Sequence, residues 1–123
     1  MVEETKFKLY IFRYMDNVIR GEFVNLAICL VEESDRSARF LGFEAIKDWS
    51  RLKSFFPHAD VESLKSWCDG LANDLQRSNG SRELLGELEN LSGNIAVTVC
   101  SRPFLSDKPP DVEMESQANL YLS

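Results

Sequence analysis

The sequence has little of what most metal sites and phosphate-binding loops require. Its 123 residues include one histidine, His58, and three cysteines that show no CxxC spacing. His-rich metal sites and relays that use two imidazoles are therefore excluded, and a zinc site would have to form without its usual spacing. The six glycines are scattered singly, and GxSxG does not occur. Phosphoryl-transfer, Rossmann and nucleophile-elbow enzymes thus lack their basic parts here.

The sequence also has no long apolar run and no secretory start. No stretch approaches the roughly 18 apolar residues of a membrane-spanning helix. The first residues, MVEETKFK, are charged and show no apolar h-region behind a basic n-region. An odd number of cysteines, spread through apolar segments, indicates reduced core thiols and not a disulfide framework. We therefore expect a cytoplasmic protein in which Cys29, Cys68 and Cys100 are free.

The charge balance argues against a nucleic-acid partner. The chain has 14 Lys and Arg against 20 Asp and Glu, so its formal net charge is −6. Residues 1–60 carry −1 of this charge and residues 61–123 carry −5. Because phosphate contacts from Lys and Arg supply most non-specific nucleic-acid affinity, an acidic C-terminal half makes such binding a poor fit. The hydrophobic content of 44% and charged content of 28% are those of an ordinary globular chain.

The spacing of apolar residues predicts one α+β domain over residues 1–123. Alternation with period two predicts strands at 6–14, 23–31 and 38–43, joined by short polar connections as in an antiparallel meander. Apolar spacings of three and four then predict helices at 45–56, from 61, and after a cap at Ser81, before a fourth strand at 95–100. The order β-β-β-α-α-α-β predicts an antiparallel sheet of about four strands with helices packed on one face. The tail from 111 to 122 is weakly helical or irregular.

Individual residues mark the limits of the predicted helices and the sides that face the core. Pro57 should end the first helix, and Asp60 should cap the second with Ser63 as its partner. His58 should be exposed in the connection between them. We expect core packing for four aromatic residues and a solvated helix face for three glutamates: Trp49, Phe55, Phe56 and Trp67, and Glu83, Glu87 and Glu89.

One polar cluster stands out where charged groups run directly into an apolar strand. It comprises Arg13, Tyr14, Arg20, Glu22 and Asn25, with Gly21 inside it. A structural interpretation has Arg20 and Glu22 pairing across a turn while the Asn25 side chain satisfies a backbone group. A functional interpretation makes these five residues a surface that recognises a partner. The sequence leaves both interpretations open.

The same residues resemble a known family. RGEFVNLA at 20–27 resembles the "RGEFVN-hydrophobic-G" segment of bacterial domain of unknown function family 3037, with Ala27 in place of the usual glycine. DWSRL at 48–52 through FFP at 55–57, and SGNI at 92–95 followed by Arg102 and Pro103, agree with it in the same order. The resemblance runs from the first strand to Leu120 and Tyr121. Members of this family often lie beside genes for HipA-like kinases, as in toxin–antitoxin systems, which suggests a small partner or regulator of such a kinase.

Two functions follow as hypotheses. The first is a non-enzymatic accessory or regulatory protein that binds another bacterial protein, such as a HipA-like kinase, through the polar cluster. The alternative is a small enzyme or nucleic-acid-processing protein that uses Arg20, Glu22 and a carboxylate such as Asp48. No cofactor, metal or membrane is implied, and the oligomeric state stays open.

Overall fold

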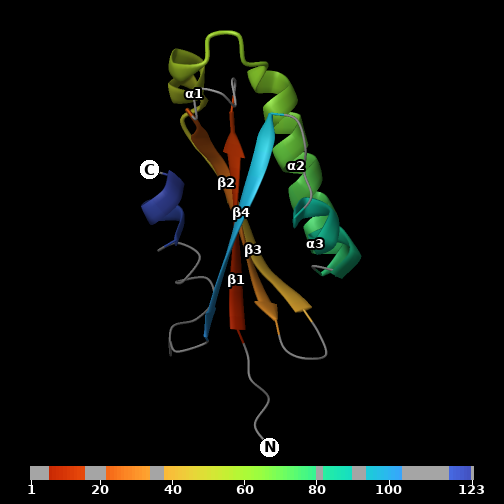
Figure 1. Ribbon diagram of the computed structural model, residues 1–123. Coiled ribbons are helices and arrows are strands. Elements are labelled where there is room, and N and C mark those ends of the chain that lie inside the picture. The colour runs from red at the N-terminus through yellow and green to blue at the C-terminus, as the bar shows by residue number, and fades with distance from the viewer. Residues whose placement is uncertain are drawn as a thin grey trace, which may run out of the picture.

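The predicted order of elements is confirmed by the computed structural model, which describes residues 6–15, 22–33, 38–79, 82–89, 94–103 and 117–122. Three strands come first, three helices follow, and a strand returns to the sheet (Figure 1). Residues 117–122 add a short C-terminal helix. The elements are β1 (Lys6–Tyr14), β2 (Val24–Glu33), β3 (Ala38–Ala45), α1 (Trp49–Phe55), α2 (Val61–Ser78), α3 (Arg82–Glu89) and β4 (Ile95–Pro103).

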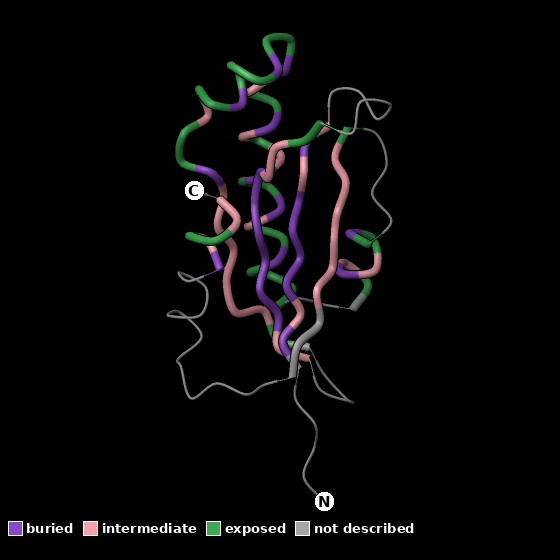
Figure 2. The backbone as a smooth tube through the Cα atoms, turned by 60° about the vertical axis from the view of Figure 1, so that its left-hand side comes forward, coloured by how far each residue is buried: buried purple, intermediate pink, exposed green. Residues whose placement is uncertain are grey.

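The four strands form one antiparallel sheet in the order β3-β2-β1-β4. The first three are a meander, as predicted, and β4 adds to the free side of β1. β1 and β2 are therefore interior strands. Their residues are mostly buried along their length, as the purple tubes in Figure 2 show. Leu26 and Ile28 of β2 are wholly buried, which confirms the prediction that this segment is central.

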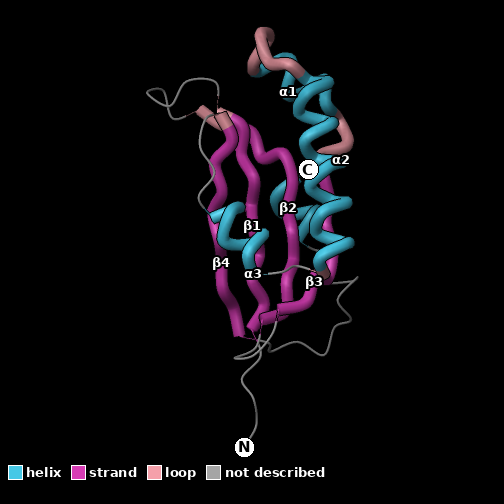
Figure 3. Tube along the Cα trace, turned by 90° about the vertical axis from the view of Figure 1, so that its right-hand side faces the viewer, coloured by secondary structure: helices cyan, strands magenta, loops and turns pink. Residues whose placement is uncertain are grey.

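Different helices pack on the two faces of the sheet. Tyr10, Phe12 and Tyr14 of β1 belong to the core beneath α1, α2 and α3, and Phe7, Leu9 and Ile11 belong to a core on the opposite face. This alternation follows directly from the period-two pattern of the strand. α2 and α3 lie over one face of the sheet, as predicted, and α1 lies beyond the end of the strands, with Leu52 in the same core (Figure 3). The C-terminal helix packs on the other, where Ala118, Tyr121 and Leu122 contact the second core.

The first helix begins later than its apolar spacing predicted. Ala45 is still in β3, paired with Ala27, and the Ile46 N–H donates to the carbonyl of Leu26 at 2.8 Å. The sheet therefore holds the backbone in an extended form up to residue 46. α1 then starts at Trp49, with Asp48 as its N-cap. The prediction of a helix start at 45 was wrong because strand pairing outweighed the local apolar pattern.

The second helix has the predicted cap. The Asp60 carboxylate accepts a hydrogen bond from the Ser63 N–H at 3.1 Å and another from the Ser63 hydroxyl at 2.8 Å. α1 ends at Phe55, two residues before Pro57. α2 ends at Ser78, and its C-cap Asn79 has a φ of 54°, the left-handed conformation that commonly closes a helix. The end of α1 and the start of α2 therefore lie beside the residues that the sequence indicated, Pro57 and Asp60.

Candidate functional site

A β-bulge changes the direction of the side chains at the start of β2. The pairing of β1 with β2 passes from Phe12 opposite Ala27 to Arg13 opposite Asn25, so Leu26 is an extra residue. Leu26 joins Ala27 in the core beneath the helices. Asn25 instead follows its pairing partner Arg13 to the other face, where its Nδ2 donates to the Tyr121 carbonyl at 2.9 Å. The bulge thus brings a polar side chain to the C-terminal helix.

Arg13 holds an aromatic ring beside this hydrogen bond. Its guanidinium carbon lies 4.5 Å from the centre of the Phe23 ring, a distance typical of a cation–π contact. The Arg13 Nε is buried and has no hydrogen-bond partner among the described residues. Among the described residues Arg13 forms no ion pair, so the contact seen for its cation there is the one with the Phe23 ring. Phe23 keeps 47% of its surface exposed while its other side rests against Arg13.

Phe23 forms one wall of a groove of about 740 Å³. Phe55 of α1 and Leu120 of the C-terminal helix form two others, and they are 63% and 66% exposed. These three are the large hydrophobic side chains that stand exposed in the described part of the chain. They come from positions far apart in the sequence, yet all line the same groove. Such a cluster of exposed apolar groups is typical of an interaction site.

Charged side chains line the side of the groove formed by the β3–α1 connection. Glu44, Lys47, Asp48 and Arg51 are all among its lining residues. Asp48 is already engaged, since its carboxylate accepts hydrogen bonds from the Ser50 hydroxyl and N–H at the start of α1. Hydrogen bonding from the Ser50 hydroxyl is the main reason that the pKa of Asp48 lies below its usual value. Lys47 and Arg51 take part in none of the ion pairs between described residues.

The structure separates the predicted site residues. Asn25 lines the groove, Arg13 supports its wall through Phe23, and Glu22 is exposed directly before Phe23. Tyr14 is buried on the helix face and packs edge-on against Phe56, with ring centres 5.3 Å apart. Arg20 lies outside the described residues. The predicted cluster is therefore divided between a groove and the core.

The sequence interpretation missed the apolar walls of the groove. It assigned Phe55 to the core with Phe56, but Phe55 is the last residue of α1 and is exposed there, and only Phe56, just past the helix, is buried. The prediction for Phe55 was wrong for this reason. Trp49 and Trp67 do pack against the core, as predicted. Phe23 and Leu120 gave no recognisable signal, because their exposure depends on how distant segments meet.

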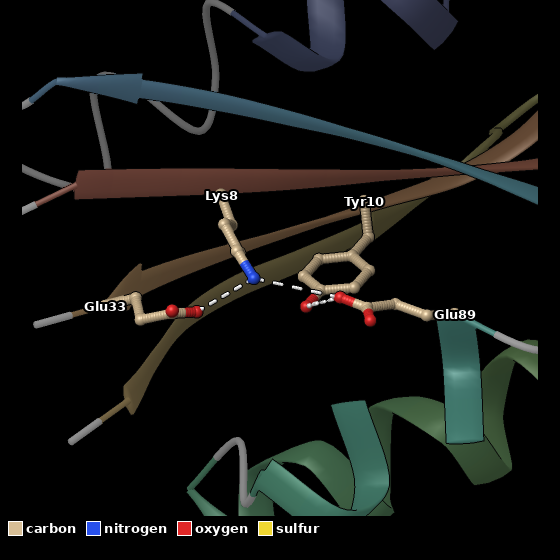
Figure 4. A network of polar contacts seen from close by, with 4 residues as sticks. All are labelled: Lys8, Tyr10, Glu33 and Glu89. Carbon is tan, nitrogen blue, oxygen red and sulfur yellow. Dashed lines mark hydrogen bonds and ion pairs between the residues drawn. The ribbon is translucent and has the colours of Figure 1, made fainter. Parts of the chain in front are cut away.

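A second polar cluster joins α3 to the sheet (Figure 4). The Tyr10 hydroxyl donates to Glu89 Oε1 at 3.2 Å, and Lys8 Nζ lies 3.1 Å from Glu33 and 3.8 Å from Glu89. Burial, with Glu89 nearby, raises the pKa of Tyr10 far above its ordinary value. Tyr10 is therefore a hydrogen-bond donor at neutral pH and not a base. These contacts attach the end of α3 to β1 and β2.

The cysteines and His58 also have side chains that can carry chemistry. Burial raises the pKa of the Cys29 thiol to about 12 and, with Asp69 adding to it, that of Cys68 to about 11. These two and the half-buried Cys100 are free, as predicted, and His58 is exposed. Within the described ranges, no three His, Cys, Asp or Glu side chains are grouped so that they could hold a metal ion. None of the described helices combines the length and the hydropathy needed to cross a bilayer.

The comparison with protein families gives one match. The family model DUF3037, described as a protein of unknown function, matches residues 10–111. This range contains Phe23, Asn25 and Phe55 but ends before Leu120. The comparisons with curated proteins and with solved structures give no match. The groove is thus built from the matched region together with the C-terminal helix that follows it.

Proposed function

The chain belongs to the DUF3037 family, and we propose that it is an accessory protein that binds a segment of another protein in the groove. One observation carries this proposal: the exposed large hydrophobic side chains of the described residues all line that groove. Single exposed apolar residues scattered over a surface are ordinary. Three such residues, from the segment just before β2, from α1 and from the C-terminal helix, are gathered at one place and favour a docking surface.

The exposure of the groove walls favours a protein segment over a small molecule. Small-molecule sites commonly bury about 70–90% of the ligand's surface. Phe55 and Leu120 leave most of their own surface in water, so the groove is wide open along these two walls. A segment of a partner protein can cover both walls at once. Aromatic residues and arginine are also the residue types that most often anchor protein interfaces.

The charges of the groove indicate what the segment carries. Lys47 and Arg51 are exposed cations without an ion-pair partner among the described residues, in a chain whose net charge is −6. The carboxylate of Asp48 is held by the start of α1. A segment that presents apolar side chains toward Phe55 and Leu120 and carboxylates toward Lys47 and Arg51, but none toward Glu44 and Asp48, is therefore complementary to this surface. We expect it to bind in the cytoplasm.

The family resemblance suggests a first candidate for this partner. A HipA-like kinase is the protein that the resemblance implies, and the proposal extends to it as a bound regulator. In this role the chain contributes a surface and not a catalytic group. The enzymatic alternative relies on Arg20, Glu22 and a carboxylate such as Asp48, whose side chain caps α1.

Site-specific photo-cross-linking tests the proposal in the native host. A photoreactive amino acid is placed at Phe55 or Leu120, and in a control protein at Ser66, which is exposed on α2 and does not line the groove. We expect the same partner, identified by mass spectrometry, to be cross-linked from positions 55 and 120 but not from 66. No specific adduct from the groove positions, or the same adduct from all three, would contradict the proposal.

A further inference from the structure

The two edges of the sheet differ in how they are protected. The β3 edge contains a bulge at Leu41, where the register passes from Leu30 opposite Gly42 to Val31 opposite Phe40. It also carries Arg39, which is paired with Glu32 of β2. The Phe40 N–H donates to the carbonyl of Asn79 at the end of α2, at 3.2 Å. Bulges, charges and a covering helix are the usual devices that prevent an edge from pairing with another chain.

Over Ile95–Ser101 the β4 edge has neither a bulge nor a charged residue, and Arg102 and Pro103 stand only at the end of the strand. Its register with β1 runs without a shift through all nine residues of the strand. The segment from Ile95 to Ser101 carries no charged side chain, and residues 95–100 are each half-buried. No described segment pairs with its outer side. An uncharged, regular edge of this length is a template for a further strand.

One hydrogen bond fixes which backbone groups of β4 face outward. The Met15 N–H donates to the Asn94 carbonyl at 2.8 Å, so residue 94 points its backbone groups toward β1. Because these groups alternate along an antiparallel strand, those of Ile95, Val97, Val99 and Ser101 face the outer side. The backbone groups of Pro103 face the same outer side as those of Val97, Val99 and Ser101. Its missing N–H therefore falls on the outer side, where proline costs the sheet no bond.

We propose that this edge pairs with the same edge of a second copy of the chain, antiparallel and centred on Thr98. The backbone groups of residues 95–101 in each copy then complete one another's hydrogen bonds, and the sheet continues through both copies. The proposal goes beyond the groove, which is lined by β2, β3, α1 and the C-terminal helix and lies away from β4. The two surfaces are therefore tested independently.

The segment is self-complementary in this register. Val97 lies opposite Val99 of the second copy, Ala96 lies opposite Cys100, and Thr98 lies opposite itself. Valine and threonine pairs across antiparallel strands are favourable, and no residue from 95 to 101 is charged; Arg102 follows this segment, opposite Asn94 of the second copy. The net charge of −6 on each copy opposes association at long range. Since salt screens this repulsion, we expect the pairing to tighten as ionic strength rises.

Sedimentation of the full chain tests whether the dimer forms. At about 100 µM, an interface with a micromolar Kd is largely occupied, and the wild-type chain should sediment as a dimer. Thr98→Lys places two like charges opposite each other and should weaken dimerisation by about tenfold or more. Thr98→Val keeps a β-branched side chain and should leave the dimer intact. A wild-type chain that stays monomeric at this concentration overturns the proposal.

Disulfide cross-linking tests the register and does not depend on Thr98→Lys folding. Thr98 pairs with itself at a position where antiparallel Cα atoms lie about 4.5 Å apart, within the range that a disulfide spans. In a Cys100→Ser background, Thr98→Cys should therefore oxidise to a covalent dimer. The Cys100→Ser protein alone should not. A dimer that fails to cross-link through position 98 uses another surface and overturns the proposal.

Discussion

The side-chain amide of Asn25 donates a hydrogen bond to the backbone carbonyl of Tyr121, 2.9 Å away and 96 positions later in the chain. This bond joins the start of β2 to the C-terminal helix, which also carries Leu120. Phe23 and Leu120, which form two walls of the groove, therefore lie on either side of this hydrogen bond. The bulge at Leu26 makes it possible, since without the extra residue Asn25 would face the opposite side of the sheet.

Replacement of Asn25 should loosen the C-terminal helix. Asn25→Ala removes the donor to Tyr121, and a hydrogen bond of this kind typically contributes about 0.5–1.5 kcal/mol to the free energy of unfolding. We expect faster amide hydrogen exchange at residues 117–122 together with a stability loss in this range. Asn73→Ala, at an exposed position on α2, is the matched control. Unchanged exchange at 117–122 would contradict the role of this hydrogen bond in holding the C-terminal helix.

The interior position of β2 predicts a large effect from truncating its side chains. Ile28 is wholly buried between strands β1 and β3, so Ile28→Ala should lower the free energy of unfolding by about 2–5 kcal/mol. Phe55→Ala, at a side chain 63% exposed, should change it by only about 0.5 kcal/mol or less. Urea denaturation measures both. Equal losses of unfolding free energy in the two variants would contradict the assignment of Ile28 to the core and of Phe55 to the surface.

The three thiols should differ in reactivity. Burial raises the pKa of Cys29 to about 12 and of Cys68 to about 11, so at pH 8 both are almost wholly in the unreactive thiol form. Cys100 is only half-buried on β4. A thiol-specific chromogenic reagent should therefore modify one cysteine rapidly in the native protein and three after denaturation. Loss of the fast phase in Cys100→Ser identifies it, whereas rapid modification of Cys29 would refute its burial.

Tyr10 should make the protein sensitive to alkali. Its raised pKa means that the folded state favours the neutral hydroxyl. The resulting stability is complete below the unfolded pKa of about 10 and is lost as the pH rises above it. Cys29, whose pKa is also raised, contributes in the same direction.

A phenylalanine at this position isolates the contribution of the hydroxyl. We expect the free energy of unfolding to fall less between pH 8 and pH 11 in Tyr10→Phe than in the wild-type chain, as measured by urea denaturation at each pH. At pH 8, the variant loses the hydrogen bond to Glu89, a net cost of about 0.5–1.5 kcal/mol. An equal alkaline loss in both proteins would mean that Tyr10 ionises freely in the folded state.

The fold was predictable where local pattern and tertiary pairing agree. The alternation of β1 gave its bounds and both of its faces, and Asp60 and Pro57 marked helix limits that the structure keeps. The helix start at Ala45 was not predictable in this way, because pairing with Ala27 decides it. The predicted hydrogen bond from Asn25 to a backbone group is confirmed, but its acceptor lies in a helix that no local signal connects to β2.

The groove was harder to predict than the fold. Arg13 and Asn25 stood out because polar groups interrupt an apolar strand, and both lie at or behind the groove. Tyr14 stood out for the same reason but is in the core, since it follows the alternation of β1. The apolar walls arise from three distant segments. Exposed apolar residues look like core residues in a sequence until the packing is known.

The affinity of the cross-linked partner for groove variants tests the central claim most directly. Phe55→Asp and Leu120→Asp place a charge on walls that are already exposed, so both proteins should keep the wild-type melting temperature. Isothermal titration calorimetry with the purified partner should show a Kd raised about 30-fold or more by each, the loss expected when an apolar anchor of about 2 kcal/mol is removed. Ser66→Asp on α2 should bind as the wild type does. Unchanged affinity in folded Phe55→Asp and Leu120→Asp proteins would contradict the assignment of the groove as the binding site.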